Sequence, residues 1–277
     1  MDKMSSIFIL ILLSSINVEA DESKENGIIT NSINNYTKEV LKVGVDNPYQ
    51  LAIDYANNIL YFSYSTFNPR TEFKSAFLDL NTNKFETIKG INGFANAVDQ
   101  ESNIIYVGAS DGIYELDIKS KTTKHVNGTS DSIWQMFFKK GLYYSTYPDE
   151  RVCVYKNGKS MQVPELSTTK GMLVALDNYE NIYFSNSSGL HVYNKTEDKI
   201  VHLGDYTING ITSDINGKLY FSTPNGIYFV DSENNIQNLI TMVLNDIYGV
   251  AVESNGNLIY STENSIIRLK LNKIKNV

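Results

Sequence analysis

The sequence predicts an all-β fold, a six-bladed β-propeller built from four-stranded antiparallel blades. The first observation is a short strand rich in Tyr and Phe, ending in Ser or Gly, that recurs six times. The second is the spacing, because consecutive copies end 37 to 45 residues apart, about the length of one blade. The third is an apolar strand and an Asn- and Gly-rich turn before most copies, which is typical of hairpins. The copies are Ile59–Ser63, Ile104–Gly108, Gly141–Ser145, Asn181–Ser185, Lys218–Ser222 and Asn257–Ser261.

The N-terminal segment predicts a secreted protein. An apolar run over residues 7–13 follows Lys3, and the small residues Val18 and Ala20 precede the expected cleavage site before Asp21, so residues 1–20 are predicted to be a signal peptide. The run is too short to span a bilayer, and we expect no membrane anchor. Residues 21–277 are expected to form a single propeller domain. Four sequons are predicted glycosylation sites: Asn35, Asn127, Asn186 and Asn194.

Composition excludes some functions. The net charge of the whole chain is −7, and removal of Asp2, Lys3 and Glu19 with the signal peptide leaves −6. No Lys/Arg stripe is available to neutralise phosphates, so we expect no nucleic-acid partner. The single cysteine, Cys153, excludes an internal disulfide and is expected to be a buried free thiol in a monomeric protein.

The first strand of each repeat is apolar, and in five repeats it ends in an acid. That acid lies in a turn, where hydrogen bonds from the local backbone explain it without catalysis. The six predicted first strands are Tyr49–Asp54, Phe94–Asp99, Ile133–Phe138, Met172–Asp177, Asn209–Asp214 and Tyr248–Glu253.

The last repeat lacks an outer strand, because the chain ends at Val277 soon after its third strand. Residues 37–43 precede the first blade and show the same alternation of polar and apolar residues as the other outer strands. We therefore predict that this N-terminal strand completes the sixth blade, which closes the ring and removes an exposed sheet edge.

The starts of the first strands predict a binding site, because these positions border one mouth of the central channel. Most of them are apolar or aromatic, which suits a planar ligand, while Asn209 and Gln50 supply directional hydrogen bonds. Two arginines on neighbouring loops are expected to pair with an anionic group. An alternative is that these side chains simply plug the channel. The candidate residues are Tyr49, Gln50, Phe94, Trp134, Met172, Asn209, Tyr248, Arg70 and Arg151.

Signs of catalysis are sparse. The three histidines, His125, His191 and His202, fall in predicted third or outer strands, which disfavours a zinc site or a His-dependent nucleophile. No Gly-x-Ser-x-Gly motif, phosphate loop or dinucleotide fingerprint is present. We therefore expect no catalytic residue, no metal and no cofactor.

The segments 208–214 and 217–222 resemble the blade motif of the gluconolactonase and senescence-marker-protein superfamily of six-bladed propellers. That resemblance implies a divalent metal in the channel, held by a Glu, Asn residues and an Asp. Asn209 matches the Asn of their Asn-Gly motif, but Tyr49 and Gln50 stand where Glu is expected and Tyr248 stands where Asp is expected. A hard cation needs such carboxylates, so a calcium-dependent lactone hydrolase is an alternative only.

The chain also resembles the insect ommochrome-binding proteins, secreted haemolymph proteins of lepidopterans that carry tryptophan-derived pigments. The likeness lies in overall length, the signal peptide, the Tyr/Asn-rich blades and the strings at 210–214 and 248–252. It implies a non-enzymatic carrier of a flat, partly anionic chromophore. An extracellular propeller that binds another protein across its loops is a further alternative.

Overall fold

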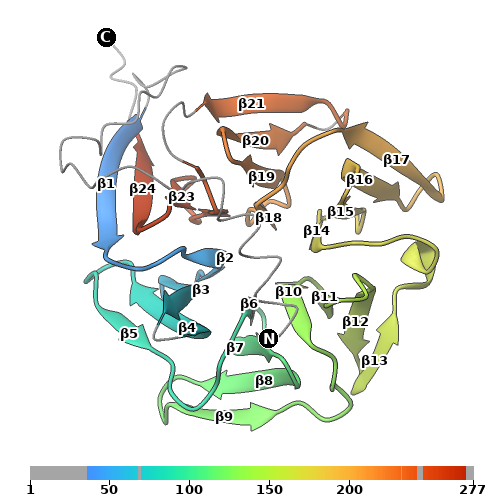
Figure 1. The fold of residues 1–277 in the computed structure, drawn as a ribbon. Coiled ribbons are helices and arrows are strands. Elements are labelled where there is room, and N and C mark those ends of the chain that lie inside the picture. The colour runs from blue at the N-terminus through green and yellow to red at the C-terminus, as the bar shows by residue number, and fades with distance from the viewer. Residues whose placement is uncertain (1–35, 68–69, 232, 242–245, 273–277) are drawn as a thin grey trace.

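The computed structural model describes residues 36–67, 70–231, 233–241 and 246–272. The predicted signal peptide and Asn35 lie outside these residues. Six four-stranded antiparallel sheets are arranged radially around a common centre (Figure 1). The predicted all-β, six-bladed propeller is therefore confirmed.

Each blade runs from an inner strand at the channel to an outer strand at the rim. Blades I to III contain β2 (Tyr49–Asp54), β3 (Ile59–Phe67), β4 (Thr71–Asp79) and β5 (Phe85–Thr87); β6 (Ala95–Asp99), β7 (Ile104–Ala109), β8 (Gly112–Asp117) and β9 (Thr122–His125); and β10 (Ile133–Phe138), β11 (Leu142–Thr146), β12 (Val152–Lys156) and β13 (Lys159–Gln162). Blades IV to VI contain β14 (Leu173–Leu176), β15 (Ile182–Asn186), β16 (Gly189–Asn194) and β17 (Lys199–Gly204); β18 (Gly210–Ser213), β19 (Leu219–Thr223), β20 (Gly226–Val230) and β21 (Ile236–Thr241); and β22 (Gly249–Val252), β23 (Leu258–Ser261), β24 (Ser265–Leu271) and β1 (Tyr36–Val43).

The N-terminal strand closes the ring as predicted. Strand β1 pairs antiparallel with β24, with a register from Tyr36 opposite Leu271 to Val43 opposite Ser265. A bulge between Val40 and Lys42 interrupts the ladder. The first and last described strands thus share blade VI, where they lie side by side (Figure 1).

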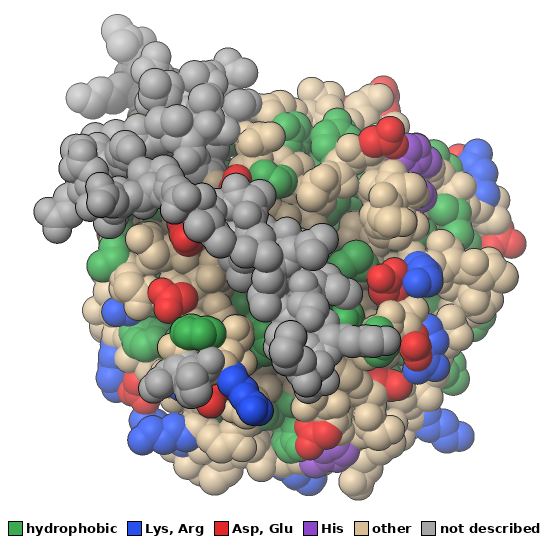
Figure 2. Space-filling model, viewed as in Figure 1, with side chains coloured by type: hydrophobic (Ala, Val, Ile, Leu, Met, Phe, Trp, Pro, Cys, Tyr) green, Lys and Arg blue, Asp and Glu red, His purple; other side chains and the backbone are tan. Residues whose placement is uncertain are grey.

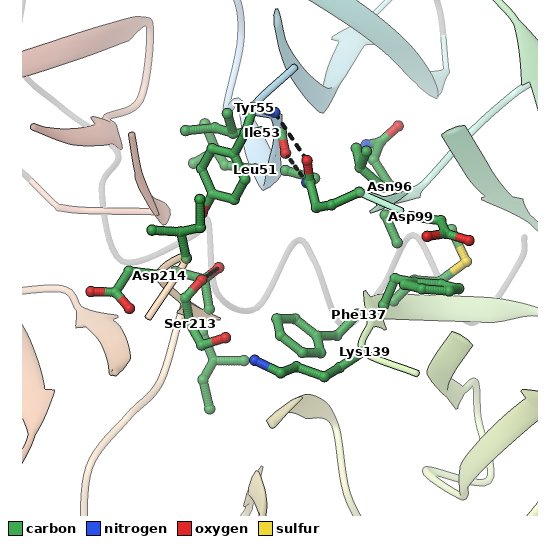
Figure 3. A pocket seen from close by; sticks show the side chains of 18 of the residues that line it. Leu51, Ile53, Tyr55, Asn96, Asp99, Phe137, Lys139, Ser213 and Asp214 are labelled. Carbon is green, nitrogen blue, oxygen red and sulfur yellow. Dashed lines mark hydrogen bonds between the residues drawn. The ribbon is translucent and has the colours of Figure 1, made fainter. Parts of the chain in front are cut away.

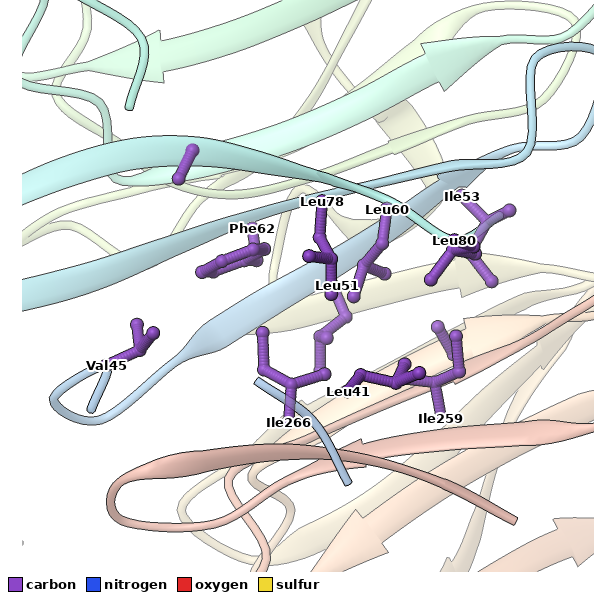
Figure 4. Packing of buried hydrophobic residues seen from close by; sticks show 12 residues of the cluster. Leu41, Val45, Leu51, Ile53, Leu60, Phe62, Leu78, Leu80, Ile259 and Ile266 are labelled. Carbon is purple, nitrogen blue, oxygen red and sulfur yellow. The ribbon is translucent and has the colours of Figure 1, made fainter. Parts of the chain in front are cut away.

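Apolar side chains hold neighbouring blades together. Between blades I and VI, Leu51, Leu60 and Phe62 share one buried cluster with Ile259 and Ile266 (Figure 4). The other faces of the blades carry similar clusters. Successive side chains of a strand point to opposite faces of the sheet, so each blade presents apolar residues to both neighbouring blades.

Five acids that end the first strands were predicted to accept backbone hydrogen bonds in their turns, and the four aspartates do so. Asp99 Oδ1 accepts from the backbone N–H of Glu101 at 3.0 Å, for example. Glu253 differs, because its Oε1 atom lies 2.9 Å from the guanidinium of Arg268 on β24. This buried ion pair has no counterpart in the sequence pattern.

The hairpin of strands β3 and β4 is longer than the sequence predicted. We expected the second strand of blade I to end at Ser63, but Tyr64 and Phe67 also lie on β3, and the ladder continues to the pair Phe67–Thr71. The aromatic side chains of Tyr64 and Phe67 and the β-branched side chain of Thr66 favour strand beyond Ser63. Arg70 consequently lies exposed near the tip of this hairpin.

Several residues lie away from the channel. Cys153 is 4% exposed and free within β12. His125, His191 and His202 lie on the third or outer strands β9, β16 and β17. On the face in Figure 2, positive and negative side chains are interspersed. The part of the chain that the structure describes contains no helix long and apolar enough to cross a membrane.

Candidate functional site

A cavity of about 500 Å³ lies where the inner strands begin, and we call it the start-side cavity. It is bordered by the residues that lead into the first strands of blades I to VI, as the sequence predicted. Seven predicted ligand-binding residues line it: Tyr49, Gln50, Phe94, Trp134, Met172, Asn209 and Tyr248.

One wall of this cavity is aromatic. The ring of Phe94 lies 5.1 Å from that of Tyr49 and 4.8 Å from that of Trp134, measured between centroids. Trp134 in turn stacks on Tyr147 at 5.4 Å, and Phe73 meets the edge of Phe94 at 4.7 Å. Such offset and edge-to-face pairs fix the orientation of each ring. The wall is therefore formed before any ligand arrives.

These rings are also largely buried. Tyr49, Phe94 and Trp134 are 5%, 3% and 7% exposed, so they fill part of the channel, as the plug alternative expected. The cavity remains beside them, and the half-buried side chains of Met172 and Tyr248 also line it. A flat molecule that entered would contact the aromatic rings and these two side chains.

Two amides supply directional groups. The Nδ2 atom of Asn209 donates to the carbonyl of Ile247 at 2.7 Å, so its Oδ1 atom, which has no partner among the described residues, is held in a fixed direction. Asn209 precedes Gly210, where a Cβ would lie 2.9 Å from the Cα of Gly249. The glycine thus lets strands β18 and β22 approach closely beside the amide.

Gln50 occupies an unusual backbone position. Its φ is 53° although it lies within β2, at an irregularity of the ladder between Tyr49 and Ala52. A non-glycine residue in the left-handed region costs free energy, and bulges often redirect a side chain beside a functional site. No side-chain hydrogen bond to another described residue occupies the Gln50 amide, which leaves it available to a ligand.

Neither predicted arginine lies on the described lining of this cavity. The guanidinium of Arg151 lies 3.1 Å from the carboxylate of Asp131 and 3.5 Å from that of Asp149. Arg70 is carried away on the long hairpin of β3 and β4. Since loop length decides where such side chains lie, the repeat pattern alone did not place them.

The described sequons differ in position. Asn127 lies exposed after β9 and Asn194 is half-buried at the end of β16, whereas Asn186 lines the start-side cavity. The Oδ1 atom of Asn186 accepts from the N–H of Ser188 at 2.8 Å. Glycosylation at these positions stays a prediction.

Other lining residues were missed from the sequence. Tyr206 and Ile208 on the loop before β18, and the exposed Asp246, also border the cavity. Each precedes an inner strand, so a wider search of these loops would have found them. Among the described residues, no three His, Cys, Asp or Glu side chains form a group that could hold a metal ion.

Comparisons with known proteins give one sequence relative and a shared fold. No protein-family model matches the chain. The ommochrome-binding protein of Manduca sexta is 37% identical over 267 residues, covering 94% of this chain and 97% of that protein. This identity confirms the resemblance inferred from the sequence.

Solved structures with the same fold are far more distant in sequence. A putative gluconolactonase has a TM-score of 0.69 at 11% identity, covering 86% of this chain and 92% of its own. A gluconolactonase from Xanthomonas campestris has a TM-score of 0.69 at 12% identity, with 86% and 90% covered. A streptogramin B lyase has a TM-score of 0.58 at 14% identity, with 88% and 100% covered. These likenesses concern the fold alone.

Proposed function

The chain belongs to the family of ommochrome-binding proteins, and from that premise we propose that it is a secreted, non-enzymatic carrier that binds an ommochrome pigment in the start-side cavity. The observation that carries the proposal is the preformed aromatic wall of Tyr49, Phe94 and Trp134 beside a cavity of about 500 Å³. Cavities of this size hold small organic ligands.

The chemistry of the cavity fits a planar, oxygen-rich chromophore. A fused ring system buries its faces against the aromatic wall and against Met172 and Tyr248, while its carbonyl and amine groups reach the amides of Gln50 and Asn209. No Lys or Arg is among the described lining residues. The acidic groups of such a ligand would therefore point toward solvent.

A fluorescence titration tests this proposal. Trp134 is the only tryptophan, so its emission reports on the aromatic wall without interference. We expect a phenoxazinone ommochrome to quench this emission with a stoichiometry of one. Tyr248→Ala should weaken binding by about tenfold, because stacking on an aromatic ring contributes roughly 0.5–1.5 kcal/mol in addition to buried area.

Tyr179→Ala is the matched control, since Tyr179 is 82% exposed on the turn after β14. Its titration should match that of the wild type. Absence of quenching, or equal effects of the two tyrosine substitutions, contradicts the proposed site. Turnover of a lactone that depends on added calcium contradicts the non-enzymatic part of the proposal.

A further inference from the structure

A second cavity, of about 690 Å³, lies where the inner strands end, and we call it the end-side cavity (Figure 3). One repeat position borders it in all six blades. This position directly follows the site of the turn acid in each repeat. The six residues are Tyr55, Gln100, Lys139, Asn178, Ile215 and Ser254.

Lys139 is the one cation among these six equivalent residues, and none of the six is an acid. It also lies in the one blade whose preceding residue is not acidic. The other five blades have Asp or Glu there, whereas blade III has Phe138, which stacks on Tyr106 at 6.0 Å. The residue before Lys139 therefore supplies no carboxylate, whereas the equivalent residue of every other blade does.

No carboxylate of the described residues pairs with Lys139. Its Nζ atom is a hydrogen-bond donor to the Oδ1 atom of Asn178, and its side chain is half-buried. Burial lowers the pKa of this lysine, while Asp177 and Asp214 oppose that effect from a distance. A partly buried cation normally has an anionic partner.

Apart from Glu101, the charged groups near Lys139 are engaged elsewhere, including Lys140, which also lines the cavity. Asp214 Oδ1 accepts from the N–H groups of Asn216 and Lys218, both at 2.9 Å, and Asp177 Oδ1 likewise accepts turn N–H groups. Figure 3 shows the carboxylates of Asp99 and Asp214 directed away from the cavity. Lys140 pairs with Glu180, and Glu101 is an exposed lining residue.

The apolar part of the cavity combines aliphatic side chains such as Ile53 and Ile211 with aromatic rings. The ring of Phe137 projects into it from the same strand end as Lys139, and Tyr55 lies across from it (Figure 3). The side chain of Gln100 links blade II to blade I through two hydrogen bonds. Its Oε1 atom accepts from the N–H of Tyr55 at 3.0 Å, and its Nε2 atom donates to the carbonyl of Ile53 at 2.6 Å.

We propose that the end-side cavity is a second binding site, for a small aromatic carboxylate whose anionic group pairs with Lys139 and whose ring lies between Phe137 and Tyr55. Although Gln50 borders both cavities, this site lies at the other end of the inner strands from the pigment site proposed above. Its ligand needs a negative charge, whereas the start-side cavity offers no described cation.

Calorimetric titration with 1-naphthoate tests the proposal, with uncharged 1-naphthamide as the paired probe. Lys139→Met should weaken naphthoate binding by about tenfold or more, because a hydrogen bond to a charged group is lost, and Lys139→Arg should restore most of it. Naphthamide should bind wild type and Lys139→Met equally. Lys140→Met, at the adjacent lysine, should leave naphthoate affinity within about twofold of the wild type.

The same variants separate this site from the pigment site. Lys139→Met should leave quenching of Trp134 by an ommochrome unchanged, and Tyr248→Ala should leave naphthoate binding unchanged. The proposal is overturned by an absence of naphthoate binding, by equal effects at Lys139 and Lys140, or by naphthoate binding that Tyr248→Ala abolishes. A purely structural role of Lys139 would lower stability without distinguishing naphthoate from naphthamide.

Discussion

Deletion of residues 21–44 is expected to lower the melting temperature by about 10 °C or more, because it removes strand β1 from blade VI. The deletion exposes the outer edge of β24 and removes Leu41, which is 5% exposed within the cluster between blades I and VI. Full burial of one leucine side chain is worth roughly 1.5–3 kcal/mol, and 1 kcal/mol corresponds to about 2–4 °C for a chain of this size, so Leu41 alone accounts for roughly 3–12 °C. Loss of the β1–β24 ladder and of the contact between Glu39 and Arg268 adds to this. Thermal unfolding followed by circular dichroism measures the effect.

Point substitutions on β1 provide the control for that deletion. Leu41→Asp places an unpaired carboxylate in the apolar cluster and should destabilise the protein by more than about 3 kcal/mol. Val43→Asp, two residues away on the same strand, should change little because Val43 is 51% exposed. An unchanged melting curve for the deletion, or equal effects of the two substitutions, would refute the closure of the ring by this strand.

Arg268→Met is expected to lower the free energy of unfolding by about 3–5 kcal/mol, because it leaves a buried carboxylate without its cation. Arg268 is 7% exposed and donates to Glu253 at 2.9 Å, to Glu39 on β1 at 3.0 Å and to the carbonyl of Leu80 in blade I at 3.1 Å. One side chain thus connects β24, β1 and the residue that follows β22 to blade I. Urea denaturation measures the loss.

Two comparisons sharpen the Arg268 test. Glu253→Gln combined with Arg268→Met should recover part of the loss, because the unpaired charge is then absent. Lys270→Met, which removes an exposed partner of Glu39, should cost less than about 1 kcal/mol. If Arg268→Met and Lys270→Met destabilise equally, the buried ion pair does not have the role assigned to it.

The same cluster sets a direction for pH dependence. Hydrogen bonds from Lys270 and then Arg268 lower the pKa of Glu39 in the folded protein. A carboxyl whose folded pKa is depressed stabilises the fold above its unfolded pKa, and that stabilisation is lost as the pH falls through the folded value. The contribution of Glu39 is therefore present at neutral pH and disappears in acid.

The sequence predicted the fold well because a propeller repeats its signals. Each copy of the Tyr/Phe strand, each turn acid and the unpaired strand at 37–43 constrained the same architecture, so local errors such as the early end assigned to β3 did not change it. Aligning the six repeats also identified the residues at the mouth of the channel, and Trp134 and Tyr248 line the same cavity as this alignment predicted.

Contacts between distant residues were not predictable in this way. Arg151 is held by Asp131, and Arg70 lies near the tip of a hairpin whose length the repeat does not specify. The pairing of Arg268 with Glu253 joins two positions that look like a third-strand cation and an ordinary turn acid. The sequence shows that no acid precedes Lys139, but only the structure shows that this lysine lines the end-side cavity.

A crystal structure of the protein with a bound ommochrome tests the central claim most directly. The proposed function predicts electron density for one planar chromophore in the start-side cavity, lying between the ring of Trp134 and the side chains of Met172 and Tyr248, with polar contacts to Gln50 and Asn209. Pigment bound only in the end-side cavity or on the outer rim, with the start-side cavity empty, would contradict it.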